Sequence, residues 1–321
     1  MKAVTRLHYC SPEKIQIKEL TIPSLKPEEI LVKVKATTVN RTDCGVLTGY
    51  TLAIRLFTGL FKPQIPITGT DFSGIVVARG ERVESFQIGD TVYGFFDQGL
   101  GSHAEYVAVS IKRAILRKPE QISFEQAVES LEGAHYAYYF LKNLQLEPGV
   151  KVMVNGGTGA IGNAAIQFLH YYGVEVTATC STDYVETVKS LGVKKVIDYT
   201  IDDFTQLDEQ FDYVFDAVGK SCFKKCKPLL KPRGVYISSE LGPNWQNLFL
   251  GMVYPLMRGR KRVKFPVPFS IVESMTFIDQ MLRSGRFKPL VDRHYSLSEI
   301  SDAFLYVMSG QKKGNVIIRL Y

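Results

Sequence analysis

The sequence predicts an α/β protein whose β-rich first third is followed by a doubly wound parallel sheet. Its 321 residues exceed the ~100–200 of an ordinary domain, which favours two domains. Strand patterns separated by glycine and proline fill the first third, and from about residue 123 strands alternate with helices. This alternation is typical of a parallel sheet with helices on both faces.

The first third contains three strand candidates. Residues 30–35, Ile-Leu-Val-Lys-Val-Lys, alternate apolar and polar side chains, as a half-buried strand does. Residues 72–78 and 91–95 have the same strand character.

Strands and helices then follow each other regularly. Residues 160–172 place apolar side chains at the 3.6-residue period of a helix. Gly192 is placed to end a second helix at 184–191. The remaining elements are strands at 151–155, 175–179, 195–197, 213–216, 234–238 and 315–320, and helices at 272–283 and 298–308.

Composition excludes several classes of protein. With 45% hydrophobic and 22% charged residues, the chain has the composition of a folded soluble enzyme. Five cysteines without a CxxC pair exclude a disulfide framework and indicate a reducing compartment. We see no secretory signal and no apolar run of the ~18–20 residues that a spanning helix needs, so we expect a cytoplasmic protein.

The net charge of +7 is scattered, apart from the run Arg258-Gly-Arg-Lys-Arg262. We interpret it as a solvated basic surface, and no nucleic-acid-binding motif accompanies it. Residues 244–262 are apolar and then basic. This segment is a substrate lid, a dimer contact or a membrane-surface foot, with the membrane the least favoured of the three.

The sharpest motif is the turn between the strand at 151–155 and the helix at 160–172. It has the pattern Gly157-x-Gly159-x-x-Gly162. We expect Gly157 to allow a tight turn, Gly159 to let a pyrophosphate approach, and Gly162 to let strand and helix pack closely. The helix N-terminus then offers N–H groups to phosphates. The turn predicts a dinucleotide-binding Rossmann domain, with Gly157, Thr158, Gly159, Ala160, Ile161 and Gly162 at the cofactor.

The second strand of this domain indicates NADPH. Enzymes that prefer NAD place an acid at its end to bind the ribose 2′-hydroxyl. Here Ser181 stands there, and the next acid, Asp183, is interpreted as a helix N-cap. Without a repelling carboxylate, Ser181 and Tyr199 are candidates to bind the 2′-phosphate.

The chain resembles the medium-chain dehydrogenase/reductase superfamily, in its zinc-free quinone oxidoreductase-like branch. The resemblance runs almost end to end. It rests on the glycine turn, on Cys180-Ser-Thr, and on the segments 36–43, 66–74, 86–94, 103–107, 190–199, 215–219 and 314–318. It implies a GroES-like catalytic domain of residues 1–122 plus 269–321, a Rossmann domain of residues 123–268, and a homodimer.

The resemblance also bears on metal. Alcohol dehydrogenases of this superfamily hold catalytic zinc with two cysteines and a histidine, whereas the matching positions here are Asn40 and Thr70. Neither replaces a thiolate or an imidazole. Without a Lewis acid, hydride transfer needs an electron-poor acceptor, so we expect a quinone or an α,β-unsaturated carbonyl as substrate.

The site residues implied by the resemblance have alternatives. Asn40 faces the nicotinamide or holds a turn, and Tyr50 supplies a phenol or packs on the surface. Glu132 bonds the ribose, moves a proton or lies at the surface. Ala217, Val218 and Gly219 form the loop beneath the nicotinamide ribose, and Lys312 reaches the pyrophosphate or is solvated.

Three functions remain open at this point. The first is an NADPH-dependent quinone or enone reductase. The second is an NADPH-binding redox sensor with little turnover, because the sequence contains no unmistakable acid–base residue. The third, an enoyl reductase for carrier-bound chains, is disfavoured because no carrier module accompanies it.

Overall fold

The computed structural model describes residues 1–50, 52–238, 240–242, 245–253, 260–268 and 270–320. The chain forms two compact units. Unit 1 comprises Met1–Glu132, Ile271–Arg283 and Pro289–Tyr321, and unit 2 comprises Gly133–Ser270 and Ser284–Lys288. The division expected after residue 122 lies before helix α3 (Phe124–Glu129), which packs on strands of unit 1.

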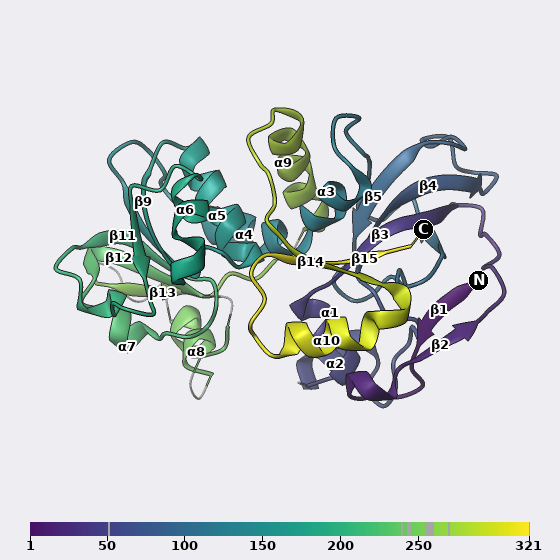
Figure 1. Ribbon diagram of the computed structural model, residues 1–321, viewed down its shortest axis with the longest axis horizontal. Helices are drawn as coiled ribbons and strands as arrows, with labels where there is room; N and C mark the ends of the chain where they lie inside the picture. Colours follow the sequence, from purple (N-terminus) through teal and green to yellow (C-terminus); the bar gives the residue numbers. More distant parts are fainter. Residues whose placement is uncertain (51, 239, 243–244, 254–259, 269, 321) are drawn as a thin grey trace. The chain divides into compact units, whose positions relative to one another are not determined.

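Unit 1 is built on a seven-stranded sheet in the order β14-β15-β3-β4-β5-β7, with β6 also paired to β3 (Figure 1). Most neighbours are antiparallel, but β14 and β15 are parallel. A separate antiparallel pair, β1 with β2, completes its strands. The bounds are β1 Lys2–Thr5, β2 Gln16–Glu19, β3 Glu29–Val39, β4 Asp71–Arg79, β5 Thr91–Phe95, β6 Tyr106–Ser110, β7 Ile115–Arg117, β14 Val291–Ser296 and β15 Asn315–Arg319.

Strand β3 shows why the alternating pattern produces this sheet. Ile30, Val32 and Val34 are buried in the core, whereas Lys33 between them is exposed. The strand continues beyond the alternating segment to Val39, because residues 36–39 pair with β15, and Thr37 and Thr38 also bond the carboxylate of Asp71 on β4. Helices α1 Arg41–Thr48, α2 Leu52–Thr58, α3, α9 Ile271–Arg283 and α10 Ile300–Met308 complete unit 1.

Unit 2 contains a six-stranded sheet in which every pair is parallel, in the order β10-β9-β8-β11-β12-β13. Numbered within the unit, this is 3-2-1-4-5-6, the order of a Rossmann fold. The predicted α/β class is therefore confirmed. The elements are β8 Lys151–Asn155, β9 Glu175–Cys180, β10 Lys195–Asp198, β11 Phe211–Asp216, β12 Leu230–Ser238, β13 Arg262–Lys264, α4 Glu132–Leu141, α5 Ala160–Tyr171, α6 Val185–Lys189, α7 Phe223–Cys226 and α8 Gln246–Met252.

The second predicted helix of this unit differs in detail. It is a 3₁₀ turn, Thr182–Tyr184, followed by the short α6. The N-cap interpretation of Asp183 is wrong, because Asp183 lies inside the turn and Ser181 precedes it. The helix also ends earlier than expected, at Lys189 with Ser190 as its C-cap, and Gly192 lies in the turn beyond it, with a φ of 82° that favours glycine.

The apolar and basic segment 244–262 is described only in part. Its residues 245–253 include α8, which exposes Phe249 and Met252. Residues 244 and 254–259 lie outside the described part, so the lid, dimer and membrane hypotheses stay predictions. Within the described residues, none of the helices is long and apolar enough to cross a membrane.

Candidate functional site

The glycine turn joins β8 to α5, as predicted, and it includes one further glycine before the predicted motif, Gly156. Gly156 adopts a φ of 94°, the left-handed region that glycine favours, whereas Gly157 has no positive φ. Gly157 lies in the turn, as predicted, and Gly156 is the residue that takes the left-handed conformation there. The signal was present in the sequence as a fourth glycine directly before the motif.

Close approach at the turn depends on two other glycines. A Cβ on Gly162 would lie 2.1 Å from the carbonyl oxygen of Gly156, so only glycine lets α5 start this near the strand. This confirms the close-packing role predicted for Gly162. A Cβ on Gly133 of α4 would lie 2.6 Å from the Cβ of Ala160, which places α4 directly against the start of α5.

The N-terminus of α5 is open to a ligand. Its N-cap, Gly159, has no side chain to bond the free N–H groups of the first turn. The nearest atom to a Cβ built on Gly159 is 3.6 Å away, so the space above it is open. Thr158, Ala160 and Ile161 complete this turn. The geometry fits the pyrophosphate of a dinucleotide, which uses such N–H groups and the helix dipole.

A buried network of hydrogen-bonded polar side chains supports the glycine turn. Thr179 accepts a hydrogen bond from the Gly156 amide at 2.8 Å and donates to Asn155 Oδ1 at 2.9 Å. Asn155 Nδ2 donates to Asp216 Oδ1 at 3.0 Å. The residues stand at the carboxyl ends of β8, β9 and β11, which are neighbours in the sheet. Sequence reasoning missed this network, although each predicted strand has a polar residue at or near its end.

The loop after β11 is drawn into the same network. The amides of Val218, Gly219 and Ser221 donate to the Asp216 carboxylate at 3.0–3.4 Å. The Val218 side chain packs over Gly156, at 2.3 Å from the position of an added Cβ. The structure thus brings the predicted cofactor residues Ala217 and Val218 to the end of β8 and the glycine turn, whereas Gly219 is held by its hydrogen bond to Asp216.

Ser181 and Tyr199 follow neighbouring strands, β9 and β10. The Tyr199 ring is 45% exposed, and its amide donates to Cys180 at 3.0 Å. Beside them lies an acid that sequence reasoning did not weigh, Asp198. Hydrogen bonds from Thr182 and Thr200 lower the pKa of its carboxyl, so it is an anion at this edge of the sheet.

In unit 1, Asn40 lies in a second buried network. The side chain is 2% exposed and caps α1 by accepting from the Asp43 amide at 2.8 Å. Its Nδ2 is within 3.3 Å of Thr70 Oγ1, Thr38 Oγ1 and Asp71 Oδ2. Both ends of the amide are therefore engaged, as in the turn-holding alternative for this residue.

Three acids gather around this network. Burial, opposed by hydrogen bonds from Thr38, raises the pKa of Asp71 to about 7. Burial and the neighbouring Asp71 raise the pKa of Asp43 well above its usual range. Glu132, 7% exposed at the start of α4, accepts a hydrogen bond from Thr42 Oγ1 at 3.0 Å. The two aspartates favour protonated carboxyls in this part of the unit.

The other two candidates in unit 1 are less enclosed. The Tyr50 side chain is 85% exposed. Lys312 precedes β15, is half-buried and lies near Cys44 of α1. Burial raises the pKa of the Cys44 thiol to about 12, against the opposing charge of Lys312. Cys44 is therefore a neutral thiol at physiological pH.

Comparison with known proteins matches both units. Residues 26–120 match the family of alcohol dehydrogenase GroES-like domains, and residues 191–318 match the zinc-binding dehydrogenase family. The chain is 30% identical to the 2-methylene-furan-3-one reductase of Solanum lycopersicum, over 99% of this chain and 79% of that protein. The chain belongs to the medium-chain dehydrogenase/reductase superfamily. It is an oxidoreductase of the quinone oxidoreductase-like branch.

Further relatives of the superfamily agree. The NADPH-dependent alkenal/one oxidoreductase of Arabidopsis thaliana is 30% identical, over 99% of this chain and 79% of that protein. The quinone oxidoreductase of Coxiella burnetii superposes with a TM-score of 0.84 at 25% identity, over 100% of this chain and 99% of that chain. The predicted family is therefore confirmed.

The description of one matching family raises the question of zinc. The donors at the position that resembles the superfamily's catalytic zinc site are the Asn40 amide and the Thr70 hydroxyl, which bond each other at 3.0 Å. His103 lies nearby, but its ring nitrogens contact Thr38 O and Thr68 Oγ1, both at 2.8 Å. This set of donors does not fit a zinc ion, which prefers thiolate, imidazole and carboxylate ligands.

Proposed function

We propose that the protein is an NADPH-dependent reductase that transfers a hydride to a quinone or an α,β-unsaturated carbonyl without a catalytic zinc. One observation carries the proposal. The turn from Gly156 to Gly162 leads into an uncapped α5, and a serine, not an acid, follows β9. The names of relatives support the acceptor class, since they include enone, alkenal and quinone reductases.

NADPH supplies the hydride when it is bound. The chain's part is to hold the phosphates at the N-terminus of α5, where N–H groups and the helix dipole favour negative charge. Without zinc, the chain lacks a Lewis acid to polarise an unactivated carbonyl. This argument supports an acceptor that is already electron-poor.

The preference for NADPH over NADH is proposed to depend on Ser181 and Tyr199. Neither side chain repels a 2′-phosphate, and both follow adjacent strand ends. Asp198 acts against the preference, because its anionic carboxylate lies on the same edge. We therefore expect Ser181→Asp to weaken NADPH binding at least tenfold and Asp198→Asn to strengthen it, with smaller changes for NADH.

For proton supply and positioning we propose Asn40, Tyr50 and Glu132, with Lys312 as a contact to the pyrophosphate. Glu132→Gln and Tyr50→Phe remove the acidic protons while keeping the shapes. A tenfold loss of kcat with an unchanged KM identifies a proton donor. Asn40→Ala removes the α1 cap as well as the amide, so its effect on the melting temperature has to be measured beside its effect on turnover.

The decisive experiment mixes the purified protein with NADPH or NADH and a panel of quinones, enones and simple ketones, and follows loss of the reduced cofactor by absorbance. Turnover of NADPH with quinones or enones, and none with ketones, supports the proposal. Faster turnover with NADH contradicts the cofactor assignment. Efficient ketone reduction contradicts the zinc-independent mechanism.

A redox sensor is the second candidate. It is favoured by the engagement of both ends of the Asn40 amide inside unit 1, which ties this side chain to the α1 cap and to Thr70. Tight NADPH binding without turnover on the whole panel would favour the sensor. We further propose a homodimer, to be checked by light scattering on the eluted protein.

A further inference from the structure

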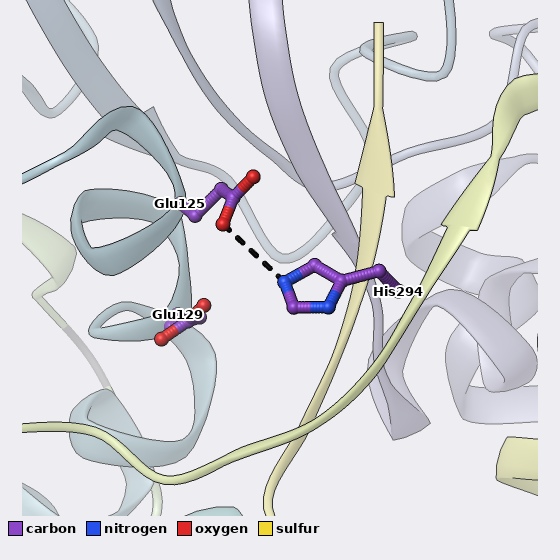
Figure 2. A group of neighbouring side chains, drawn as sticks. All are labelled: Glu125, Glu129 and His294. Atoms are coloured by element: carbon purple, nitrogen blue, oxygen red, sulfur yellow. Dashed lines mark ion pairs between the residues drawn. The ribbon is translucent and has the colours of Figure 1, made fainter.

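Three side chains of metal-binding types meet in unit 1. They are Glu125 and Glu129 on α3 and His294 on β14 (Figure 2). One ligand atom from each lies within 4.8 Å of the other two. The two glutamates lie one helical turn apart on α3, far in the sequence from His294. Helix α3 packs on β3, β4, β5 and β15, and β14 is the edge strand beside β15.

Glu129 is the unusual member of this group. The residue is 3% exposed, and both carboxylate oxygens are buried without a hydrogen-bond partner in the described part of the chain. Buried carboxylates are normally paired or bound to a metal, because a lone buried charge is very costly. Burial and the neighbouring charge of Glu125 raise the pKa of Glu129 to about 8, against the opposing charge of Arg319.

The other two members leave room for an ion. His294 Nε2 lies 3.3 Å from Glu125 Oε2, and their side chains are 32% and 25% exposed, so solvent reaches the group. Arg319 Nε donates to the other oxygen, Glu125 Oε1, at 2.6 Å. A ligating carboxylate is commonly oriented in this way by a hydrogen bond to its second oxygen. The Nη2 contact to Oε2, at 3.2 Å, is the one that an ion would replace.

We propose that Glu125, Glu129 and His294 bind one divalent metal ion of the zinc type, which ties α3 to β14. One imidazole and two carboxylates suit zinc and its first-row neighbours, and water would fill the fourth position. Bonds of ~2.0–2.2 Å place tetrahedral ligand atoms roughly 3.5 Å apart. The Glu125–His294 pair, at 3.3 Å, already meets this spacing, and a carboxylate oxygen of Glu129 lies within 4.8 Å of both, so ion binding requires it to move closer. The site is structural and separate from the proposed hydride transfer.

The test uses the full chain, stripped of metal by a chelator, with Zn²⁺ and Co²⁺ as probes. We expect titration calorimetry to show one Zn²⁺ per chain and the melting temperature to rise on binding. Loss of an outer-shell partner weakens metal binding by ~10–100-fold, so Glu129→Gln and His294→Gln should each cost at least that. His8→Gln, at an exposed histidine of the same unit, is the matched control and should bind like wild type.

Co²⁺ separates this site from the free cysteines, because thiolate ligands give an intense charge-transfer band that oxygen and nitrogen ligands do not. The proposal is overturned if Zn²⁺ does not bind, if Glu129→Gln and His294→Gln bind it as tightly as wild type, or if the Co²⁺ complex shows the thiolate band. His294 is partly exposed, so His294→Gln is expected to fold even if the buried variant does not; circular dichroism checks both.

Discussion

Each unit contains a buried network of asparagine, threonine and aspartate, and the two networks differ in how charge is balanced. In unit 2, Asp216 accepts from three backbone amides, Asn155 and Tyr236. In unit 1, besides burial, the charge of Asp71 raises the pKa of Asp43, and the charge of Glu132 raises the pKa of both. The first network is satisfied as an anion and fixes a backbone turn. The unit 1 network is most stable when its aspartate carboxyls are protonated.

The largest effect is expected where the unit 2 network meets the glycine turn. Gly162→Ala places a Cβ 2.1 Å from the Gly156 carbonyl oxygen, and such overpacking costs about 1–3 kcal/mol or more. We expect NADPH affinity to fall by on the order of 100-fold, because the N–H groups of α5 move away from the phosphates. Fluorescence titration with NADPH measures it.

Gly159→Ala is the control for this prediction. It has a φ of −63° and open space around the added methyl, so the fold should keep its stability. A loss of NADPH affinity in this variant, at an unchanged melting temperature, would show that the cofactor fills the space. Wild-type NADPH affinity in both Gly162→Ala and Gly159→Ala would show that the glycine turn does not bind the cofactor.

Asp216→Asn should come next in size. The amide keeps one acceptor and turns a donor toward the Ser221 amide or the Tyr236 hydroxyl. Leaving a buried donor unsatisfied costs about 1–3 kcal/mol, so we expect a loss of about 2 kcal/mol in the free energy of unfolding by urea. The proposed difference between the two networks is contradicted if Asp71→Asn in unit 1 lowers the free energy of unfolding at pH 8 as much as Asp216→Asn does.

The unit 1 network should instead give a pH dependence. The pKa of Asp71 is raised in the folded state to about 7, so its contribution to stability is present below pH ~4 and is lost as pH rises to about 7. Urea unfolding between these pH values should show a difference between wild type and Asp71→Asn that changes by at most ~1.4 kcal/mol per pH unit. Burial lowers the pKa of His103 to about 4, so His103 changes stability with pH in the opposite direction. Its contribution is the same in wild type and Asp71→Asn and therefore cancels in the difference.

The smallest effect on stability is expected at the hydrogen bond between Thr42 and Glu132 in unit 1. Thr42→Val removes the 3.0 Å hydrogen bond to Glu132 and should cost about 1 kcal/mol. Thr48→Val on the same helix is the control, because its hydroxyl bonds backbone carbonyls of its own helix, those of Cys44 and Gly45. Equal losses in the two variants would mean that the Glu132 contact contributes nothing of its own.

Local patterns explain what the sequence predicted well. The strands at 91–95 and 151–155 have the predicted bounds, since alternation or an apolar run followed by glycine is decided within a few residues. The parallel sheet followed from the βα alternation, and the cofactor turn from three spaced glycines. These features need no knowledge of distant contacts.

Features that depend on distant residues were not predictable. The Asn40 network joins residues 37–43 to Thr70 and Asp71, and sequence order says nothing about their distance. In the sequence Gly133 is only a small residue in a helix, and its role in close packing becomes visible once α4 is placed against Ala160. Glu129 has the sequence pattern of a surface helix residue, and only the packing of α3 shows it to be buried.

The place of β15 in the sheet of unit 1 has a consequence for synthesis on the ribosome. This strand lies between β3 and β14, with Val316, Ile317 and Ile318 completely buried, yet it is translated after all of unit 2. Unit 2 is almost continuous, so its contacts are complete while the partner of β3 is still being made. We expect the nucleotide-binding unit to fold first, and nascent chains arrested before residue 315 to hold a protease-resistant unit 2 beside an unfinished unit 1.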